Sequence, residues 1–220
     1  MYILSWNVLL REYEEKYYPC SEILKNYPVE TIRLNHVIKI IKNSIHIDET
    51  VVCLQECSLD LLTMLKETFP QFTVHNKKIG ENDYLVTMTP IRVDFSIDPV
   101  ETGIPHSQLI VKTNRFRIIN CHLIPQKHCD IPILARLNQF CKEENDKITI
   151  IAGDFNEKIG VVKNEFLNDY IVPYFGYTYR YKQIDYILVE RGKNDLIYCP
   201  LLIKSIRVSD HYPVKLFVKI

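Results

Sequence analysis

The fold is decided by residues 148–156, which read ITIIAGDFN. A short run dominated by isoleucine and closed by a glycine predicts a buried β-strand. Gly153 allows the backbone to turn sharply at the end of this strand, and Asp154 and Asn156 follow at once. An acid and an amide therefore stand where a buried strand gives way to a loop, which is where functional side chains are usually carried.

The same arrangement recurs along the chain, with polar residues at the ends of apolar runs. The sites are Asn7 in LSWNV, Gln55-Glu56 after VVCL, His122 after IINC, Asp154 and Asn156 in GDFN, Asp185 in QIDYI, and Asp210-His211 after Ser209. Polar groups placed at strand ends can converge on one point outside a sheet. We therefore expect these residues to form one site, although they are far apart in the sequence.

Size and composition indicate one globular domain. The chain has 220 residues, of which 47% are hydrophobic and 25% charged, and no Gly/Ser-rich or Pro-rich linker divides it. Disorder would require far less apolar content than this. We expect a single domain over residues 1–220 with a substantial core.

The formal charge balances, with 27 basic and 27 acidic residues. No global positive field holds the protein on nucleic acid or anionic lipid, so any polyanion must be bound locally. Basic pairs are candidates for such contacts, although pairs of this kind are usually solvated loop charges. They are Lys77-Lys78, Arg115 with Arg117, Arg180 with Lys182, and Lys204 with Arg207.

The seven cysteines are odd in number and irregularly spaced. Cys53 and Cys121 lie within apolar runs, where thiols behave as small buried hydrophobes, and this usage is typical of a reducing compartment. Cys53 and Cys57 also have a spacing compatible with zinc, but a strand would make their side chains diverge. No apolar run is long enough for a membrane span, and the first strand leaves no room for a signal peptide. We expect an intracellular protein, cytoplasmic or nuclear.

Nine short β-rich segments predict strands that outnumber the helices. They are residues 2–9, 51–55, 72–75, 84–88, 108–112, 116–122, 148–152, 184–189 and 212–218. Apolar residues at helical spacing predict helices over residues 30–43, after Ser58, and over residues 130–142. Residues 112–116 predict a hairpin turn, whereas helix-separated strands indicate longer crossovers. An α/β fold with mixed sheets and outer helices follows.

Hydrolysis of a phosphodiester requires neutralised phosphate oxygens, an activated water and help for the leaving oxygen. Glu56 at a strand terminus, with Asn7 and Asp210 nearby, would make the oxygen-rich site that Mg²⁺ prefers. Asp154 is our candidate water-activating base, and Asn156 can steer the water or a phosphate oxygen with its amide. The alternative is that GDFN is only a turn sequence, because Asp and Asn favour turns.

Two histidines complete the candidate chemistry. His211 can donate a hydrogen bond to a phosphate oxygen, and a carboxylate behind it, which we assign to Asp185, would fix its tautomer. Ser209 is rejected as a nucleophile, since residues two apart in a strand-entry loop do not bring hydroxyl and ring face to face. His122 is a candidate second phosphate ligand, with a satisfied core histidine as its alternative.

The motifs in chain order resemble a known superfamily. Trp-Asn-Val, Leu-Gln-Glu, Cys-His-Leu, Gly-Asp-Phe-Asn, Ile-Asp-Tyr-Ile-Leu and Ser-Asp-His, across nearly the whole chain, are similar to the endonuclease/exonuclease/phosphatase superfamily, which has the DNase I-like fold. The resemblance implies a four-layer α/β/β/α sandwich with a Mg²⁺ or Mn²⁺ site at one end of its two sheets. It implies Glu56 as the main metal ligand with Asn7 and Asp210, Asp154 and Asn156 for water and phosphate, the pair Asp185 and His211, and His122 as the motif histidine.

Other segments bear on the substrate. Residues 6–9, Tyr13, residues 18–20 and Arg33 look like the deadenylase, nocturnin and 2′-phosphodiesterase branch, which implies RNA or oligoadenylate. Residues 122–123 with Arg136 also look like enzymes that remove tyrosine from DNA 5′ ends.

Aromatic residues between 174 and 181, interleaved with basic ones, can stack bases and hold phosphates, or can pack on the sheet as hairpin residues. Arg136, Tyr179 and Arg180 are our candidate substrate-binding residues. We predict a monomeric Mg²⁺-dependent phosphodiesterase acting on RNA or single-stranded DNA, away from membranes. The alternatives are a 5′-tyrosyl-DNA phosphodiesterase or another phosphoesterase with the same site, and a catalytically silent binding module.

Overall fold

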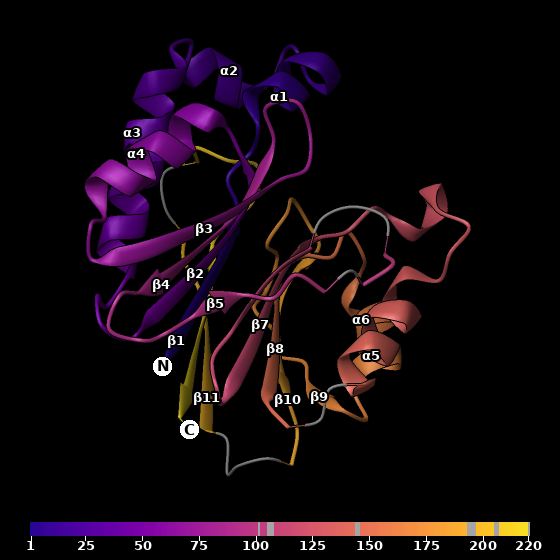
Figure 1. The fold of residues 1–220 in the computed structure, drawn as a ribbon. Helices are drawn as coiled ribbons and strands as arrows, with labels where there is room; N and C mark the ends of the chain where they lie inside the picture. The colour runs from indigo at the N-terminus through magenta and orange to yellow at the C-terminus, as the bar shows by residue number, and fades with distance from the viewer. Residues whose placement is uncertain (101, 105–107, 144–145, 193–196, 205–206, 220) are drawn as a thin grey trace.

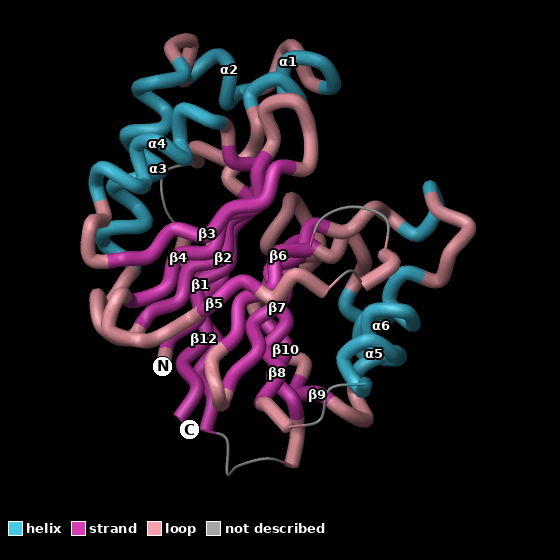
Figure 2. Tube along the Cα trace, viewed as in Figure 1, coloured by secondary structure: helices cyan, strands magenta, loops and turns pink. Residues whose placement is uncertain are grey.

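Apolar runs of the sequence form twelve strands in the described part of the chain, and these make two sheets of six strands each. The computed structural model describes residues 1–100, 102–104, 108–143, 146–192, 197–204 and 207–219. The sheets pack face to face, with helices on the outer side of each (Figures 1 and 2). The predicted four-layer α/β/β/α sandwich is confirmed.

The first sheet, sheet A, carries both ends of the chain. Its strand order is β11 (Ile197–Leu202), β12 (Val214–Lys219), β1 (Tyr2–Asn7), β2 (Thr50–Cys57), β4 (Tyr84–Pro90) and β3 (Phe72–Lys78). Strands β1 and β2 are parallel, and the other neighbours are antiparallel. The parallel pair makes β1 and β2 end at the same edge, which brings Asn7 beside Gln55.

The second sheet, sheet B, has the same mixed pattern. Its order is β5 (Ser96–Ile97), β6 (Gln108–Lys112), β7 (Phe116–His122), β8 (Ile148–Asp154), β10 (Asp185–Glu190) and β9 (Tyr170–Ile171). Strands β7 and β8 are parallel, with α5 (Ile133–Glu143) on the connection between them, and the other neighbours are antiparallel. The predicted turn between β6 and β7 is confirmed, since the Thr113 amide donates to the Phe116 carbonyl.

Three hydrophobic clusters hold the layers together. The middle cluster lies between the sheets and includes Ile3, Val51 and Cys53 from sheet A with Val111, Ile118 and Ile150 from sheet B. The outer clusters pack helices α3 (Glu30–Ser44) and α4 (Leu59–Thr68) on sheet A, and α5 (Ile133–Glu143) and α6 (Ile159–Phe166) on sheet B. Apolar burial of this kind is the main stabilising term in folding.

Cys53, Cys57 and Cys121 lie in three different hydrophobic clusters. They therefore share no zinc site, and each fills core space as predicted. All seven cysteines are free thiols.

Helix α3 braces the loop that follows β1. The predicted stripe Leu34, Val37, Ile38 and Ile41 is buried. From the same helix the buried Arg33 guanidinium donates to the carbonyls of Val8, Leu9 and Val208, at 2.7, 2.8 and 2.9 Å. Charged donors make stronger hydrogen bonds than neutral ones. Arg33 therefore connects the loop after β1 firmly to the loop before β12.

Several short elements are absent from the predictions. They are helices α1 (Arg11–Tyr17), α2 (Glu22–Asn26) and α6, and strands β5, β9 and β11. Helix α1 reads REYEEKY and offers almost no apolar period, and β5 and β9 have two residues each. In the described part of the chain, no helix combines the length and apolar character that a membrane crossing needs.

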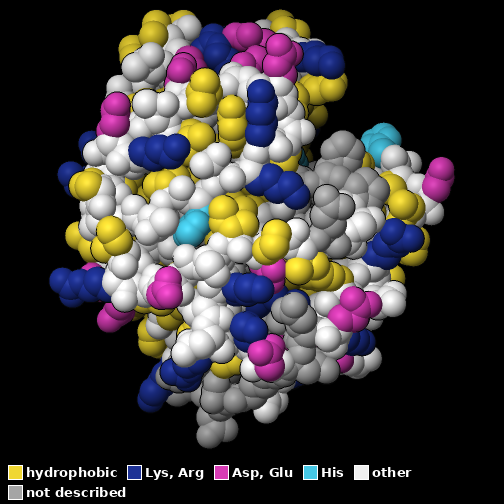
Figure 3. Space-filling view, viewed as in Figure 1, with side chains coloured by type: hydrophobic (Ala, Val, Ile, Leu, Met, Phe, Trp, Pro, Cys, Tyr) yellow, Lys and Arg dark blue, Asp and Glu magenta, His cyan; other side chains and the backbone are white. Residues whose placement is uncertain are grey.

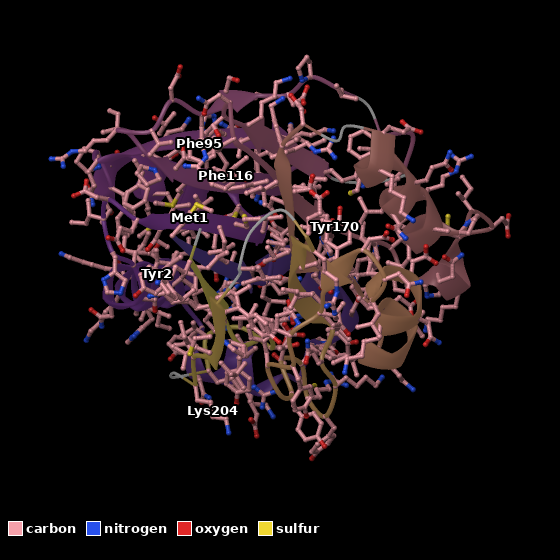
Figure 4. All side chains as sticks on the ribbon, turned by 90° about the horizontal axis from the view of Figure 1, so that it is seen from below. Met1, Tyr2, Phe95, Phe116, Tyr170 and Lys204 are labelled. Atoms are coloured by element: carbon pink, nitrogen blue, oxygen red, sulfur yellow. The ribbon has the colours of Figure 1, made fainter. Side chains whose placement is uncertain are left out.

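The outer surface shows interspersed charges. In the face seen in Figure 3, basic and acidic side chains alternate with apolar ones and no large area carries one sign. This agrees with the balanced formal charge. Binding of a polyanion must therefore depend on local groups.

Candidate active site

Three site residues of sheet B form a single row. His122 at the end of β7 pairs in register with Asp154 at the end of β8, and Asp154 pairs with Asp185 at the start of β10. Neighbouring strands in a sheet lie less than about 5 Å apart, so these side chains are placed side by side by the ladder itself. Asp154 and Asp185 are buried, and His122 is partly exposed.

Gly153 is required by this row. Its φ is 149°, and a Cβ at this position would lie 1.8 Å from the carbonyl oxygen of Cys121 on β7. Any side chain would therefore force β7 and β8 apart just before His122 and Asp154. The next loop is held by Asp154 itself, whose Oδ1 accepts the Asn156 amide at 2.8 Å.

Sheet A supplies its residues through irregular backbone. Asn7 ends β1, while Glu56 sits in β2 where the register with β4 shifts between Leu54 and Cys57. Glu56 has a φ of 56°, in the left-handed region that is uncommon for a residue with a side chain. Bulges re-aim side chains at sheet ends, and this one directs Glu56 toward Asn7.

The two sheets meet through Asn7. Its Nδ2 donates to Glu56 Oε1 at 2.8 Å and to Asp154 Oδ2 at 3.1 Å. His122 Nε2 lies 3.6 Å from the same Glu56 oxygen and 3.8 Å from the same Asp154 oxygen. A single cluster therefore contains predicted residues from β1, β2, β7 and β8.

The loop before β12 brings His211 to this cluster. Ser209 Oγ donates to the Asn7 carbonyl at 2.7 Å and accepts the His211 amide at 3.1 Å. Ser209 is thus a loop anchor, in agreement with its rejection as a nucleophile. His211 Nδ1 lies 2.9 Å from Asp185 Oδ2, and Nε2 faces Asp154 Oδ2 at 3.8 Å.

Electrostatics separate the roles of these groups. Burial by itself would lower the pKa of His211, but the carboxylates of Asp185 and Asp154 outweigh it and raise the pKa well above 6.5. Burial raises the pKa of Asp154 to about 6, against the opposing effect of His211. The site therefore pairs an imidazolium with a carboxyl group that titrates near neutral pH.

Two groups of side chains suit a divalent cation. Asp210, whose pKa is raised by burial and by Glu56, has a buried Oδ1 that accepts no hydrogen bond from the described residues. With Glu56 it offers the carboxylate oxygens that Mg²⁺ or Mn²⁺ takes. The Asn7 side-chain oxygen accepts the Leu9 amide at 3.0 Å and its nitrogen faces Glu56, so Asn7 orients this group. Asp154, Asp185 and His211 also have ligand atoms within 4.8 Å of one another, but Asp185 and His211 already satisfy each other. We favour the first group.

Three cavities run in sequence across the site. The central one, about 350 Å³, is lined by Glu56, His122, Asp210, His211 and residues of α1. It shares Tyr13 and His122 with a cavity of about 190 Å³ beside Asp83 and Asn156, and Tyr18 with a cavity of about 490 Å³ beside Arg180. The shared residues indicate one extended cleft, of which the Glu56–His211 cavity is the middle.

The structure brings two of the three predicted substrate-binding residues to the cleft. Tyr179 reaches the cluster, since its ring centre lies 4.8 Å from that of His211, and Arg180 lines the adjoining cavity. Tyr174, Tyr177 and Tyr181 are exposed, so they do not pack on the sheet as the alternative expected. Arg136 is not brought to the cluster: it donates to the Gly103 carbonyl from the outer helix α5 and lines none of these three cavities.

Two cleft residues are not among the predicted site residues: Asp83, and Tyr13, which the sequence analysis names only for its resemblance to one branch of the superfamily. Tyr13 on α1 donates to Asp83 Oδ2 at 3.1 Å, and both line the smallest cavity. Burial raises the pKa of Asp83 to about 6. The signal for this pair was weak, because Asp83 lies in GENDY, which reads as a turn, and Tyr13 lies in a helix without an apolar stripe.

The fold and the edge cluster define a DNase I-like sandwich, and comparisons with solved structures agree. Over 99% of its length the chain is similar to a truncated TDP2 of Caenorhabditis elegans, at 16% identity and a TM-score of 0.72 over 96% of that chain. It is similar over its full length to an endonuclease/exonuclease/phosphatase family protein of Leptotrichia buccalis, at 17% identity and a TM-score of 0.69 over 100% of that chain.

A third similar structure is ANGEL2, described as a 2′,3′-cyclic phosphatase, at 14% identity and a TM-score of 0.73, covering 98% of this chain and 94% of that one. No family model and no curated protein matches the sequence. At these identities the likeness establishes the fold. The chain therefore has the fold of the endonuclease/exonuclease/phosphatase superfamily, as the six motifs indicated.

Proposed function

We propose that this protein is a metal-dependent phosphodiesterase that hydrolyses nucleic acid by in-line attack of water, with no covalent intermediate. The observation that carries the proposal is the meeting of Glu56, Asp154 and His211 in one cluster at the joined ends of both sheets, where Glu56 and His211 line a cavity and Asp154 lies directly behind them. These groups supply a cation ligand, a base and a proton donor, which are the requirements of phosphodiester hydrolysis.

The cation side of the reaction belongs to sheet A. Glu56 and Asp210, with Asn7 beside them, would hold Mg²⁺ or Mn²⁺. When bound, the ion neutralises charge on phosphate oxygens and polarises the phosphoryl group. The Asn7 amide, shared between Glu56 and Asp154, keeps the cation ligand next to the base.

The proton and phosphate chemistry belongs to sheet B and His211. Asp154, with a pKa of about 6, is ionised at neutral pH and is suited to take a proton from the attacking water. Asp185 holds Nδ1 of His211, so Nε2 carries a proton toward the cleft and can donate to a phosphate oxygen. His122 and Asn156 border the same cleft and position the phosphate.

RNA or an oligoadenylate is the substrate we favour, with single-stranded DNA as a further possibility for the same cleft. The exposed tyrosines beside Arg180 support a single-stranded ligand, because aromatic faces stack bases of any sequence. A similar TDP2 structure, of D. rerio, was solved with a single-strand DNA product. That neighbour supports a second candidate function, hydrolysis of a 5′-tyrosyl-DNA adduct.

The test is side-by-side digestion of labelled RNA, single-stranded DNA, 2′,5′-oligoadenylate and a phosphotyrosyl oligonucleotide, with Mg²⁺ titrated from zero. We expect metal-dependent cleavage, fastest on RNA or oligoadenylate. Fastest turnover of the phosphotyrosyl substrate would select the second candidate. No turnover of any substrate or of a generic diester would leave the silent binding module as the answer.

We also propose that the protein acts inside the cell as a monomer. The free thiols of all seven cysteines are compatible with a reducing compartment. Fractionation of the source cells and sedimentation of the purified protein test these two points.

A further inference from the structure

The cavity of about 490 Å³ next to the active site is a feature that the proposed chemistry does not use. It is lined by Tyr18, residues 19–23, Arg180 and Arg207, and it shares Tyr18 with the central cavity. Arg180 follows Tyr179, whose backbone bridges to His211. The cavity is therefore continuous with the site where the scissile phosphate would lie.

Arg180 is held in place without a carboxylate partner. Its guanidinium lies over the rings of Tyr18 and Tyr179, at 5.1 and 5.2 Å from their centres. The Arg180 guanidinium forms no ion pair within 4.0 Å with any acidic side chain that the structure describes. Aromatic stacking of this kind fixes an arginine and leaves its donors available.

The backbone of Arg180 is also in an unusual conformation. Its φ is 47°, in the left-handed region, where Gly and Asn are favoured and arginine is not. Such strain persists only where the surroundings impose it, and it clusters at ligand sites. Here the two-residue hairpin turn closed by Tyr179 and Lys182 imposes it, and this turn holds the guanidinium near both tyrosine rings.

Arg207 adds a second positive charge on the same cavity. Among the described residues its guanidinium pairs with the carboxylate of Glu22 at 3.7 Å, and the two side chains are 47% and 80% exposed. Exposed pairs at this distance are weak and screened by salt. Two guanidinium groups against one solvated carboxylate leave the cavity net positive.

The other two cavities have the opposite character. The central cavity is lined by Glu14, Glu56 and Asp210, and the smallest by Asp83, and neither has a lysine or arginine in its lining. In a chain of zero net charge, the described cleft therefore has its positive end at Arg180 and Arg207. A polyanion entering the cleft is oriented by this difference.

We propose that the cavity of Arg180 and Arg207 is a second phosphate subsite, which binds a backbone phosphate of a polynucleotide next to the scissile one. Guanidinium groups present paired donors that match phosphate oxygens, and Tyr18 provides a stacking face at the boundary with the catalytic cavity. This inference rests on the proposed function and specifies its substrate as a chain of linked nucleotides. A diester with a single phosphate leaves the subsite empty.

Kinetics on substrates of different length test the subsite. Arg180→Gln and Arg207→Gln are assayed on the p-nitrophenyl ester of thymidine 5′-phosphate, which has one phosphate, and on oligonucleotides of two to six residues. We expect each variant to lose at least about tenfold more kcat/KM on the longer oligonucleotides than on the single-phosphate ester, mostly through KM. The slope of log KM against log salt should fall by roughly 0.7 for each arginine removed, because each phosphate contact releases counterions.

Arg92→Gln is the matched control. Arg92 is 78% exposed, pairs weakly with Asp48 at 3.5 Å, and follows β4 at the opposite end of sheet A. It should leave both substrates unaffected. The proposal would be overturned if the two arginine variants lost kcat/KM equally on short and long substrates, or lost none on either.

Binding separates this inference from the proposed function. Fluorescence anisotropy of a labelled hexanucleotide on Glu56→Ala, with and without Arg180→Gln, measures the subsite without turnover. A roughly tenfold weaker Kd with Arg180→Gln supports the subsite even if no hydrolysis is found, whereas an unchanged Kd removes it even if hydrolysis is fast.

Discussion

The two sheets build the same site in different ways. In sheet B, His122, Asp154 and Asp185 form one register row across three adjacent strands, which strand pairing places once Gly153 allows β7 and β8 to approach. Sheet A contributes Glu56 from a bulge, while Asp210 and His211 come from a loop. Leu9 and Glu56 have φ of 65° and 56°. The regular row supplies the base, and the strained edge supplies the cation ligands.

The two sheets also differ in what holds their site residues in place. A row of paired residues is fixed by the whole ladder and needs little further support. A bulge and a loop need braces, and sheet A has them in Arg33, which binds the loop carbonyls, and in Ser209, which binds Asn7. We therefore expect side chains on the sheet A edge to be the more sensitive to change.

The largest effect should come from Glu56→Ala. It removes the carboxylate that Asn7 and the Leu10 amide orient, at 2.8 and 3.0 Å, and with it the main cation ligand. We expect kcat/KM to fall by about 10³-fold or more, on the scale of losing a main electrostatic group. The melting temperature should stay near that of the wild type.

Glu67→Ala, on the exposed face of α4, is the matched control and should keep full activity. Full metal-dependent activity in Glu56→Ala would contradict the assignment of this edge to the cation.

A smaller loss is expected for Asp185→Asn, which acts on the regular row. Asp185 helps to raise the pKa of His211, so in the variant that pKa falls and the imidazolium is lost at lower pH. We expect about 10²-fold lower kcat and an alkaline limb of the pH–rate profile moved to lower pH.

The sign of the stability effect follows from linkage. Because the folded pKa of His211 is raised, the pair stabilises the protein fully below 6.5 and loses this contribution as pH rises through the folded value. The metal-free variant should therefore differ most from the wild type near pH 6. The control Asp94→Asn, at an exposed position, should change neither the pH–rate profile nor the pH dependence of stability. An alkaline limb that does not move in Asp185→Asn would show that Asp185 does not raise the pKa of His211.

The junction between the sheets is the next place to test. Asn120 on β7 accepts from Gln55 at 2.8 Å and donates to the carbonyls of Leu54 and Val86, at 3.1 and 2.9 Å. Asn120→Leu removes these three buried hydrogen bonds and leaves Gln55 with its longer ones to Ser5 and Cys53, so we expect a loss of about 2–4 kcal/mol in the free energy of unfolding. Urea titration measures it.

A double-mutant cycle with Gln55→Leu sharpens this test. The two side chains share one hydrogen-bond network. The double variant should therefore lose less free energy of unfolding than the two single variants lose in sum, by about 0.5–3 kcal/mol. Asn164→Leu, on the exposed side of α6, should change little. Additive losses would show that Gln55 and Asn120 act independently.

The regular row was predictable from the sequence, and the braces were not. Ile148–Asp154 and its relatives are strands whose apolar content and terminal polar residues follow simple rules. The two-sheet sandwich itself came from the resemblance of six motifs. Arg33 was noticed only as part of a motif, since nothing local shows that a helix arginine will bind three carbonyls 24 to 175 residues away. Hydrogen bonds between residues far apart in the chain leave no periodic pattern in the sequence from which they could be predicted.

Arg136 shows the converse case. A resemblance to enzymes that remove tyrosine from DNA 5′ ends suggested it for the site, but α5 covers the outer face of sheet B and directs the guanidinium to Gly103. Spacing along a chain says that a residue lies on a helix, whereas the face that it occupies depends on which side of the sheet the helix packs.

The smallest effect should come from Asp83, which precedes β4 at the edge of sheet A. Burial raises its pKa from 3.8 to about 6, so the folded state holds this proton more tightly than the unfolded chain does. Stability contributed by the protonated group is therefore lost as pH rises from about 4 through 6. Two pKa units correspond to about 3 kcal/mol as an upper bound, and we expect roughly half of it.

Asp83→Asn removes this titration while its amide oxygen can still accept the Tyr13 hydroxyl. Thermal unfolding of the metal-free protein should show the variant gaining stability over the wild type between pH 4 and 7, with no such gain for the exposed Asp94→Asn. Tyr13→Phe should act in the opposite direction, because its hydroxyl donates to the ionised carboxylate and its loss raises the pKa of Asp83 further. A stability difference that is flat with pH would mean that Asp83 is ionised in the folded protein without cost. The unfavourable features at this end of sheet A would then be the positive φ angles of Glu56 and Leu9.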